Sequence, residues 1–173
     1  MELQEAIQGR RSIRNFKKQN IPKELITQLI EAASYAPSAG NIQPWQFVIV
    51  RNQAVKRKFA ESALNQHQIE QAPVVIVVCA DEKRASMGYS TRGRTLYCLQ
   101  DTAAAAQNIL LTAYSLGLGT CWIGAFDEEE VIEAINAPEG IRPVAIIRVG
   151  VPGQKPRQRV RKIISQITYY DSF

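Results

Sequence analysis

The spacing of apolar residues in three stretches of the chain is that of amphipathic helices. In residues 2–8, 22–35 and 53–64, apolar side chains recur three and four positions apart among polar ones, so each stretch would present one apolar face. Pro22 fits the first position of the second helix, because its missing N–H and fixed φ suit a helix start. The third stretch carries many charges and predicts a surface helix.

A longer helix is predicted from about residue 94 to residue 116. The four alanines Ala103–Ala106 place methyl groups around the whole circumference, so we expect this helix to be buried on most sides. Asp101 and three amide residues interrupt it, which argues against a membrane span. Such a helix in a short chain favours burial against a second subunit as well as its own sheet, with a monomeric core as the alternative.

Four further segments predict strands. Residues 45–50, 73–80 and 143–150 are rich in β-branched and aromatic residues, and we expect the first to be buried. The uninterrupted apolar run at 73–80 is typical of a central strand covered on both faces. Residues 117–124 hold three glycines and predict a short strand that another group approaches closely. These glycines follow a helix and not a strand, which argues against a dinucleotide-binding fingerprint.

The remaining segments have weaker patterns. Asp127, with Glu130 three residues later, predicts a capping box at the start of a helix over residues 128–136. Residues 81–93 are charged and contain glycine, and we expect a mobile segment or lid. Residues 152–173 lack enough local partner surface to fold alone, so we interpret them as an arm on another surface, a partner's included.

Length and charge narrow the class of protein. The 173 residues, 46% of them hydrophobic, suffice for one domain, 1–173, with its own core. A net charge of +5 and a pI near 9.2 mildly favour anionic ligands. The basic clusters at 10–18, 51–58 and 155–162 come with no zinc-finger spacing or RNP-like motif, so nucleic-acid binding is a minor alternative.

The reactive residue types exclude several kinds of site. Three cysteines at unrelated spacings indicate a reduced, cytoplasmic chain, with Cys79 as a small buried hydrophobe. The single histidine, His67, lies in a polar run and is expected at the surface, which makes a His-based metal site or a Ser-His-Asp triad hard to build. Polar residues interrupt the N-terminus, so we expect no signal peptide.

A basic segment between the first two predicted helices suggests an anion site. Residues 10–16 contain three arginines and one serine within five positions, and so many like charges repel unless an anion lies among them. Arginine donors match a phosphate bidentately, so we hypothesise a phosphate site at Arg10, Arg11, Ser12 and Arg14. A solvated basic turn is the alternative.

A second candidate is the loop at residues 36–45. Its prolines, glycine and alanines would let a flat ligand approach the backbone. Asn41 and Gln43 can donate and accept hydrogen bonds, as recognition of a heterocycle edge requires. A plain turn with Trp45 entering the core is the alternative.

Taken in order, five motifs resemble the nitroreductase family of FMN-dependent oxidoreductases, and the match covers nearly the whole chain. The motifs are Arg-Arg-Ser-Ile-Arg-Asn-Phe at 10–16, Ala-Pro-Ser-Ala-Gly-Asn-Ile-Gln-Pro-Trp at 36–45, Ala-Pro-Val-Val-Ile-Val-Val at 72–78, Gly-Leu-Gly-Thr-Cys-Trp-Ile-Gly at 117–124 and Ile-Ile-Arg-Val-Gly-Val-Pro at 146–152. The resemblance implies an α+β three-layer sandwich with a mostly antiparallel central sheet flanked by helices. It also implies an intertwined homodimer with two FMN sites at the interface, in which the arm at about 152–173 joins the partner's sheet.

The resemblance assigns the phosphate end of the FMN site to residues from the N-terminal segment and from the C-terminal arm. By that match Arg10, Arg11, Ser12 and Arg14 hold the phosphate and ribityl end, and Arg14 also lies near the N1–C2 edge of the flavin. Arg159 or Arg161 would return from the arm to the phosphate.

The resemblance also implies where the ring lies. Pro37, Ser38 and Ala39 would come from the other subunit, with Asn41 and Gln43 supporting that loop. Further positions match the surroundings of the ring: Asn65 and Gln66 near its polar edge, and Ile123 and Gly124 beside N5. Cys121 next to them could be redox-active, but a packed thiol is favoured.

The implied activity is ping-pong hydride transfer from NADH or NADPH through flavin N5 to a nitroaromatic, quinone or similar acceptor. The flavin would do the chemistry while the protein binds and tunes it, so no side chain need be a nucleophile. One arginine 4 Å from the reduced ring is worth about 4 kcal/mol at an effective dielectric of 20. The alternatives are a flavin dehydrogenase or reductive dehalogenase specialised for one metabolite, and a flavin carrier or sensor without turnover.

Overall fold

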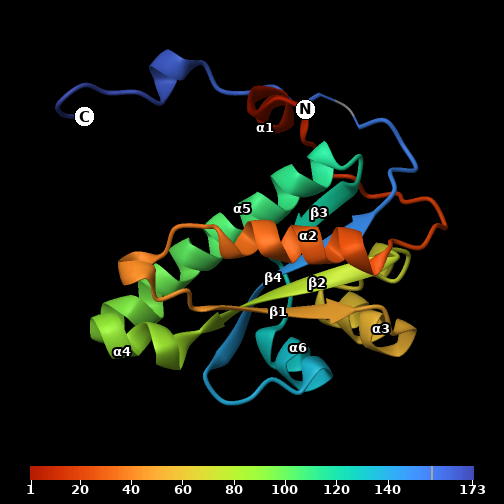
Figure 1. The fold of residues 1–173 in the computed structure, drawn as a ribbon, viewed down its shortest axis with the longest axis horizontal. Helices are drawn as coiled ribbons and strands as arrows, with labels where there is room; N and C mark the ends of the chain where they lie inside the picture. Colours follow the sequence, from red (N-terminus) through yellow and green to blue (C-terminus); the bar gives the residue numbers. More distant parts are fainter. Residues whose placement is uncertain (157) are drawn as a thin grey trace.

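The computed structural model describes residues 1–156 and 158–173 and contains one four-stranded sheet (Figure 1). In spatial order the strands are β1 (Trp45–Val50), β2 (Val74–Asp81), β4 (Ile141–Gly150) and β3 (Gly119–Ile123). Every pair of neighbours is antiparallel, as expected for a mostly antiparallel sheet. The register places Thr120 opposite Val149 and Cys121 opposite Arg148.

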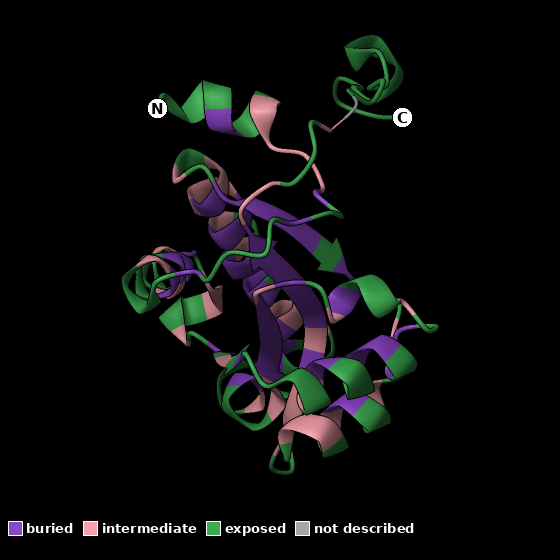
Figure 2. Ribbon diagram, turned by 90° about the vertical axis from the view of Figure 1, so that its right-hand side faces the viewer, coloured by how far each residue is buried: buried purple, intermediate pink, exposed green. Residues whose placement is uncertain are grey.

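Helices cover both faces of this sheet. Helices α2 (Lys23–Ser34) and α5 (Cys98–Ser115) pack on one face, and α3 (Gln53–Ser62) and α6 (Glu128–Ile135) pack on the other (Figure 1). The buried sheet lies between these layers in Figure 2. Helix α1 (Leu3–Gly9) packs near the end of α5. The predicted three-layer α+β sandwich is therefore confirmed.

The apolar patterns explain which elements are buried. In α2 the stripe of Ile26, Leu29 and Ala33 faces the core, as its spacing predicted. The first seven residues of β2 are buried, which confirms the predicted central strand. The prediction that residues 45–50 form a buried strand is wrong in part, because β1 is the sheet edge and its Gln46 and Ile49 are exposed.

The expected mobile segment or lid at 81–93 is helical instead. Helix α4 (Glu82–Arg92) begins after Asp81, whose Oδ1 accepts the Arg84 N–H at 2.8 Å. A kink at Tyr89 and Ser90, with φ 47° at Ser90, turns the chain into a π-helical turn at Gly93–Tyr97 that leads into α5. The helix was missed because it buries only one of its side chains and so has almost no apolar periodicity.

Two further expectations concern α5 and α6. In the single chain α5 is buried or half-buried on most sides, as predicted, and Gln100, Ala103 and Gln107 form one exposed stripe. Asp127 does cap α6, with its Oδ1 accepting the Glu130 N–H at 3.0 Å. The predicted capping box is not completed, however, since the Asp127 N–H donates to the Ser62 carbonyl at 2.9 Å.

The C-terminal segment leaves the body of the protein. Every residue from 158 to 173 is exposed, and a 3₁₀ turn at Ile164–Gln166 is its one helical element in the described chain. Figure 1 shows this segment running past α1 and away from the sheet. Within the described residues, none of the helices combines the length and the apolar character needed to cross a membrane.

Candidate functional site

The basic segment is held as an extended strand-like piece between β3 and the start of the arm. Ser12 forms a parallel bridge with Thr120, and the Ile13 N–H donates to the Thr120 carbonyl at 2.8 Å. Farther along, the Lys17 N–H donates to the Val151 carbonyl at 2.9 Å. These main-chain bonds fix the backbone of the segment, which therefore differs from a loose solvated turn.

The arginines of this segment line a cavity of about 460 Å³ together with the arm. Its lining comprises Arg10, Arg11, Ser12, Arg14, Gln154, Lys155, Pro156, Arg159 and Arg161. Burial and the charges of Arg161 and Arg11 lower the pKa of Arg10, while the Cys121 sulfur acts in the opposite direction. The structure thus brings both predicted arm arginines to the predicted phosphate-binding residues.

The residues predicted to lie beside the flavin ring follow β3 away from this cavity. Ile123 is the last residue of β3, and Gly124 follows it. Gly124 is four residues beyond Thr120, which is about 13 Å at the usual rise per strand residue. Asn65 and Gln66 follow α3, and Asn65 adopts a left-handed conformation with φ 57°. The bond from Asp127 N–H to the Ser62 carbonyl joins the chain before Asn65 to the chain after Gly124. One chain therefore brings the phosphate-end and ring-end predictions to neighbouring places along β3.

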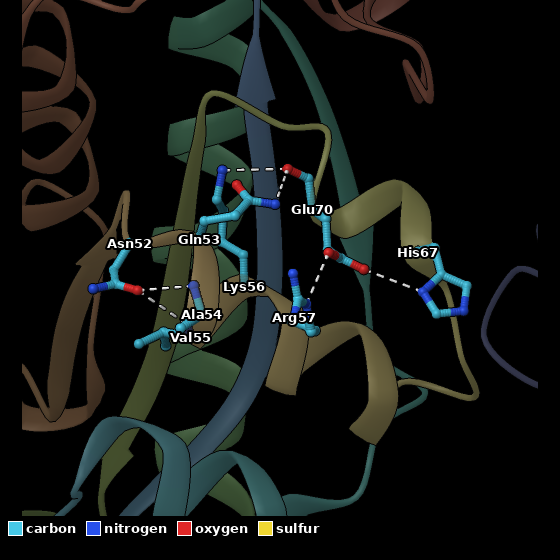
Figure 3. Close-up of polar contacts among 8 residues, drawn as sticks. All are labelled: Asn52, Gln53, Ala54, Val55, Lys56, Arg57, His67 and Glu70. Carbon is cyan, nitrogen blue, oxygen red and sulfur yellow. Dashed lines mark hydrogen bonds and ion pairs between the residues drawn. The ribbon is translucent and has the colours of Figure 1, made fainter.

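A polar network fixes the turn that carries Asn65 and Gln66 (Figure 3). The Glu70 carboxylate is hydrogen-bonded to His67 Nδ1 at 3.1 Å and forms an ion pair with Arg57 Nε at 3.6 Å, and these two contacts lower the pKa of Glu70. The Lys56 Nζ donates to the carbonyls of Glu70 at 3.3 Å and Ala72 at 2.8 Å. His67 is exposed, as predicted. The network therefore holds the turn after Gln66 against α3.

The loop at residues 36–45 forms a compact unit of its own. The Ser38 Oγ accepts the Gln43 N–H at 3.0 Å, and the Gln43 Nε2 donates to the Asn41 Oδ1 at 3.1 Å. Asn41 and Gln43 both have positive φ, near 55°. The Ala39 N–H donates to Asp101 Oδ1 at 3.2 Å, which ties the loop to the first turn of α5.

Within one chain the structure does not bring this loop to the basic cavity. Asp101 holds the loop at the start of α5, whereas Gly9, next to the cavity-lining Arg10, packs against Tyr114 at its end. Thirteen residues of helix separate these contacts by about 20 Å. Figure 1 shows the loop beside α4 and the basic segment at the opposite end of the molecule. Pro37, Ser38 and Ala39 could share a ligand with Arg14 only if they came from another copy of the chain.

Sequence reasoning missed two buried charged residues near these elements. Arg148 on β4 is 1% exposed, and its Nε and Nη1 have no hydrogen-bond partner among the described residues. Its signal was a single arginine in the apolar run 143–150. Asp101 was seen only as an interruption of a helix, yet it anchors the loop through Ala39, and burial raises its pKa.

The three cysteines are buried free thiols. Burial raises the pKa of Cys79 to about 12, which suits the predicted packing role. Cys121 is 4% exposed, consistent with the favoured packed thiol. Within residues 1–156 and 158–173, no group of three or more His, Cys, Asp or Glu side chains could hold a metal ion.

Comparison with known proteins agrees with the motifs. A family model described as "Nitroreductase family" matches residues 7–71 and 62–151. The chain belongs to the nitroreductase family. It is 37% identical over 163 residues to a Methanothermobacter thermautotrophicus protein named as an NADH dehydrogenase/NAD(P)H nitroreductase, covering 92% of this chain and 82% of that protein.

Two further relatives have names that include FMN. One is the Bacillus subtilis FMN reductase [NAD(P)H], 32% identical over 185 residues, with 97% of this chain and 74% of that protein covered. The other is the solved structure of the NADPH:FMN oxidoreductase from Vibrio harveyi complexed with NAD⁺. It superimposes with a TM-score of 0.91 at 28% identity, over 99% of this nitroreductase-family chain and 77% of that one. The predicted family and fold are confirmed.

Proposed function

We propose that this chain is an FMN-dependent NAD(P)H oxidoreductase that works by a ping-pong cycle. The observation that carries the proposal is the cavity in which six basic side chains and Ser12 surround one space beside β3. FMN and a reduced nicotinamide nucleotide are the cofactors that fit a nitroreductase-family chain with relatives named as FMN reductases. In the proposed cycle the hydride is finally accepted by any of a range of compounds, such as nitroaromatics or quinones.

The basic cavity fits the phosphate end of FMN. A phosphate dianion would relieve the like-charge repulsion that lowers the pKa of Arg10. Arg14, Arg159 and Arg161 supply further guanidinium donors around the same space, and such forks match phosphate oxygens bidentately. The Arg11 guanidinium also donates hydrogen bonds to the main-chain carbonyls of Gln8 and Arg10, and these bonds orient its side chain. These residues would hold and orient the phosphate.

The chain continues from this cavity toward the proposed ring site. Ile123 and Gly124 would lie beside N5, because they form the end of β3 and the residue after it. Asn65 and Gln66 would lie at the polar edge, because the turn after α3 carries them. FMN held by these residues would supply the chemistry of hydride transfer between NADH or NADPH and the acceptor, through its N5 position. Arg14 would favour the reduced ring by placing positive charge near N1.

We propose a homodimer because one chain holds only part of this site. The loop that carries Pro37, Ser38 and Ala39 is about 20 Å along α5 from the basic cavity. A second copy would supply this loop to the ring, with Asn41 and Gln43 holding its shape. The exposed stripe of α5, Gln100, Ala103 and Gln107, gives such a partner a helix surface without charged side chains to pack against.

The arm supports the same assembly. Its apolar side chains are largely exposed, with Val160 at 98% and Ile164 at 70%. At the sheet edge, an open groove of about 740 Å³ lies between α2 and β1 and is lined in part by Ile26, Ile30 and Ile49. Edge strands offer unpaired main-chain groups to another strand. The arm of one copy would therefore cover the β1 edge of the other, with residues 1–173 forming a single domain.

The three free thiols fit a reducing compartment, so we place the protein in the cytoplasm. The proposed activity is tested by an anaerobic visible spectrum of the purified protein. FMN-loaded protein should absorb near the flavin bands and bleach on addition of NADH or NADPH. Adding a quinone or nitroaromatic should then restore the oxidised spectrum. A colourless protein that ignores added FMN would refute the proposal, and a bound flavin that no nicotinamide reduces would favour a carrier or sensor.

A further inference from the structure

Arg148 is a buried cation that the described chain does not neutralise. Its side chain is 1% exposed, and its Nε and Nη1 have no hydrogen-bond partner in the described part of the chain. Its guanidinium lies over the ring of Phe16, with the guanidinium carbon 5.9 Å from the ring centroid. A guanidinium does not lose its proton in proteins, so Arg148 keeps its charge in this apolar setting.

Lys56 is another buried cation of this chain, and it differs from Arg148 in having hydrogen-bond acceptors. It is 5% exposed, and its Nζ donates to the carbonyls of Ala72 and Glu70, as Figure 3 shows for Glu70. Lys56 is thus supplied with acceptors by the main chain. A buried charge without such acceptors is costly unless another molecule provides the opposite charge.

The position of Arg148 in the sheet indicates which molecule that is. Arg148 on β4 is directly opposite Cys121 on β3, so the two side chains leave the same face of the sheet. Ile123 lies two residues beyond Cys121 and therefore on that face as well. Thr120, on the other side of Cys121, holds the Ser12 end of the basic segment. Arg148 therefore lies on the strand next to the part of β3 that runs from the phosphate end to the ring end of the proposed FMN site.

A second contact links this position to the basic segment. Phe16, against which Arg148 packs, belongs to residues 10–16 and bridges to Pro152 at the start of the arm. Arg148 therefore packs against the segment that carries the proposed phosphate-binding residues.

We propose that the negative charge of bound flavin mononucleotide offsets the charge of Arg148, which makes Arg148, on the strand next to β3, a positioning residue for the cofactor. This inference rests on the proposed FMN site. The compensating charge is the phosphate, which is present in both redox states, or the N1 region of the reduced ring. Arg148 would favour FMN over uncharged riboflavin in the first case and would raise the flavin's reduction potential in the second.

The test compares three variants in the full-length protein. Arg148→Met removes the charge with similar volume, Arg148→Lys keeps the charge, and Lys56→Met removes a buried cation that has its own acceptors. For each we would measure thermal unfolding with and without FMN, the dissociation constants of oxidised FMN and riboflavin, the flavin reduction potential and the dimer dissociation constant.

We expect Arg148→Met to have opposite effects on the stability of the FMN-free protein and on its affinity for FMN. Arg148→Met should leave the FMN-free protein as stable as the wild type or more so, because an uncompensated buried charge is removed. The same change should weaken FMN binding about tenfold or more while riboflavin binding changes little, or it should lower the reduction potential. Arg148→Lys should restore most of the lost effect. Lys56→Met is the control for stability only: it should destabilise the FMN-free protein, because the carbonyls of Glu70 and Ala72 lose their buried donor.

Three results would overturn the inference. One is an Arg148→Met protein that is less stable without FMN but keeps both its FMN affinity and its potential, which would make Arg148 purely structural. Another is a change confined to the dimer dissociation constant, which would assign the compensating charge to a second copy. The third is equal weakening of FMN and riboflavin with an unchanged potential. Wild-type protein that binds no FMN would instead refute the proposed function itself.

Discussion

Replacing Arg14 tests whether the basic cavity is a phosphate site. Arg14 lines the cavity, and its guanidinium makes no recorded hydrogen bond or ion pair with the described residues. Its removal should therefore cost little folding stability, and any effect on FMN affinity reports the ligand contact. Lys17 is the matched control, because it is an exposed cation of the same segment outside the cavity lining. Its main-chain bond to Val151 survives substitution by alanine.

The expected magnitude follows from the contact that Arg14 would make. A hydrogen bond to a charged group contributes about 1.5–3 kcal/mol. Because 1.4 kcal/mol is tenfold in affinity, Arg14→Ala should weaken FMN binding by about 10- to 150-fold. Lys17→Ala removes only a distant charge, which salt screens over a Debye length of about 8 Å at physiological ionic strength, so we expect a change below about twofold.

Flavin fluorescence titration of both variants measures the difference, with circular dichroism as the check that each is folded. Repeating the titration with riboflavin separates the phosphate contribution from contacts with the ring. Equal and small effects of Arg14→Ala and Lys17→Ala on the FMN dissociation constant would refute the phosphate site. Equal losses for FMN and riboflavin in Arg14→Ala would mean that Arg14 contacts the ring and contributes nothing to phosphate binding.

Three further predictions concern the surroundings of the site. Burial raises the pKa of Asp101 above 3.8, so the folded state holds its proton more tightly and stability should fall as pH rises from about 3.8 through the folded pKa. Asp101→Asn keeps an acceptor for Ala39 and should be at least as stable as wild type at pH 7, with the difference shrinking toward pH 4 in thermal unfolding. Gly93→Ala should destabilise the protein by about 1–3 kcal/mol in urea unfolding, because a Cβ there would lie 2.2 Å from the Ala85 carbonyl oxygen. Deleting residues 163–173 should shift the protein from dimer to monomer in light scattering while Arg159 and Arg161 remain.

Each of these has a contradicting outcome. A wild-type advantage over Asp101→Asn that persists at pH 7 would mean that the carboxylate charge itself stabilises the fold. An unchanged urea midpoint in Gly93→Ala would mean that the turn after α4 can move away from Ala85. A shortened chain with the same mass in solution as the full one would remove the arm from the proposed interface.

The sequence by itself determined the elements whose environment is uniform along their length. The continuous apolar run of β2 and the stripe of α2 predict their own burial, because every position repeats the same local signal. The charge cluster at residues 10–14 likewise indicated an anion site, since mutual repulsion is a property of neighbours in the chain.

Only the tertiary structure decided features that depend on long-range pairing. Strand β1 has an apolar sequence, yet it is an edge strand because no described segment pairs with its outer side. Asp127 offers its N–H to Ser62 and not to Glu130, because the tertiary fold brings the end of α3 to the start of α6. No pattern in the sequence could show that Asp101 holds one half of the predicted site about 20 Å from the other. The burial of Arg148 has the same cause: a residue's environment is set by segments far away in the chain, and local periodicity carries no record of them.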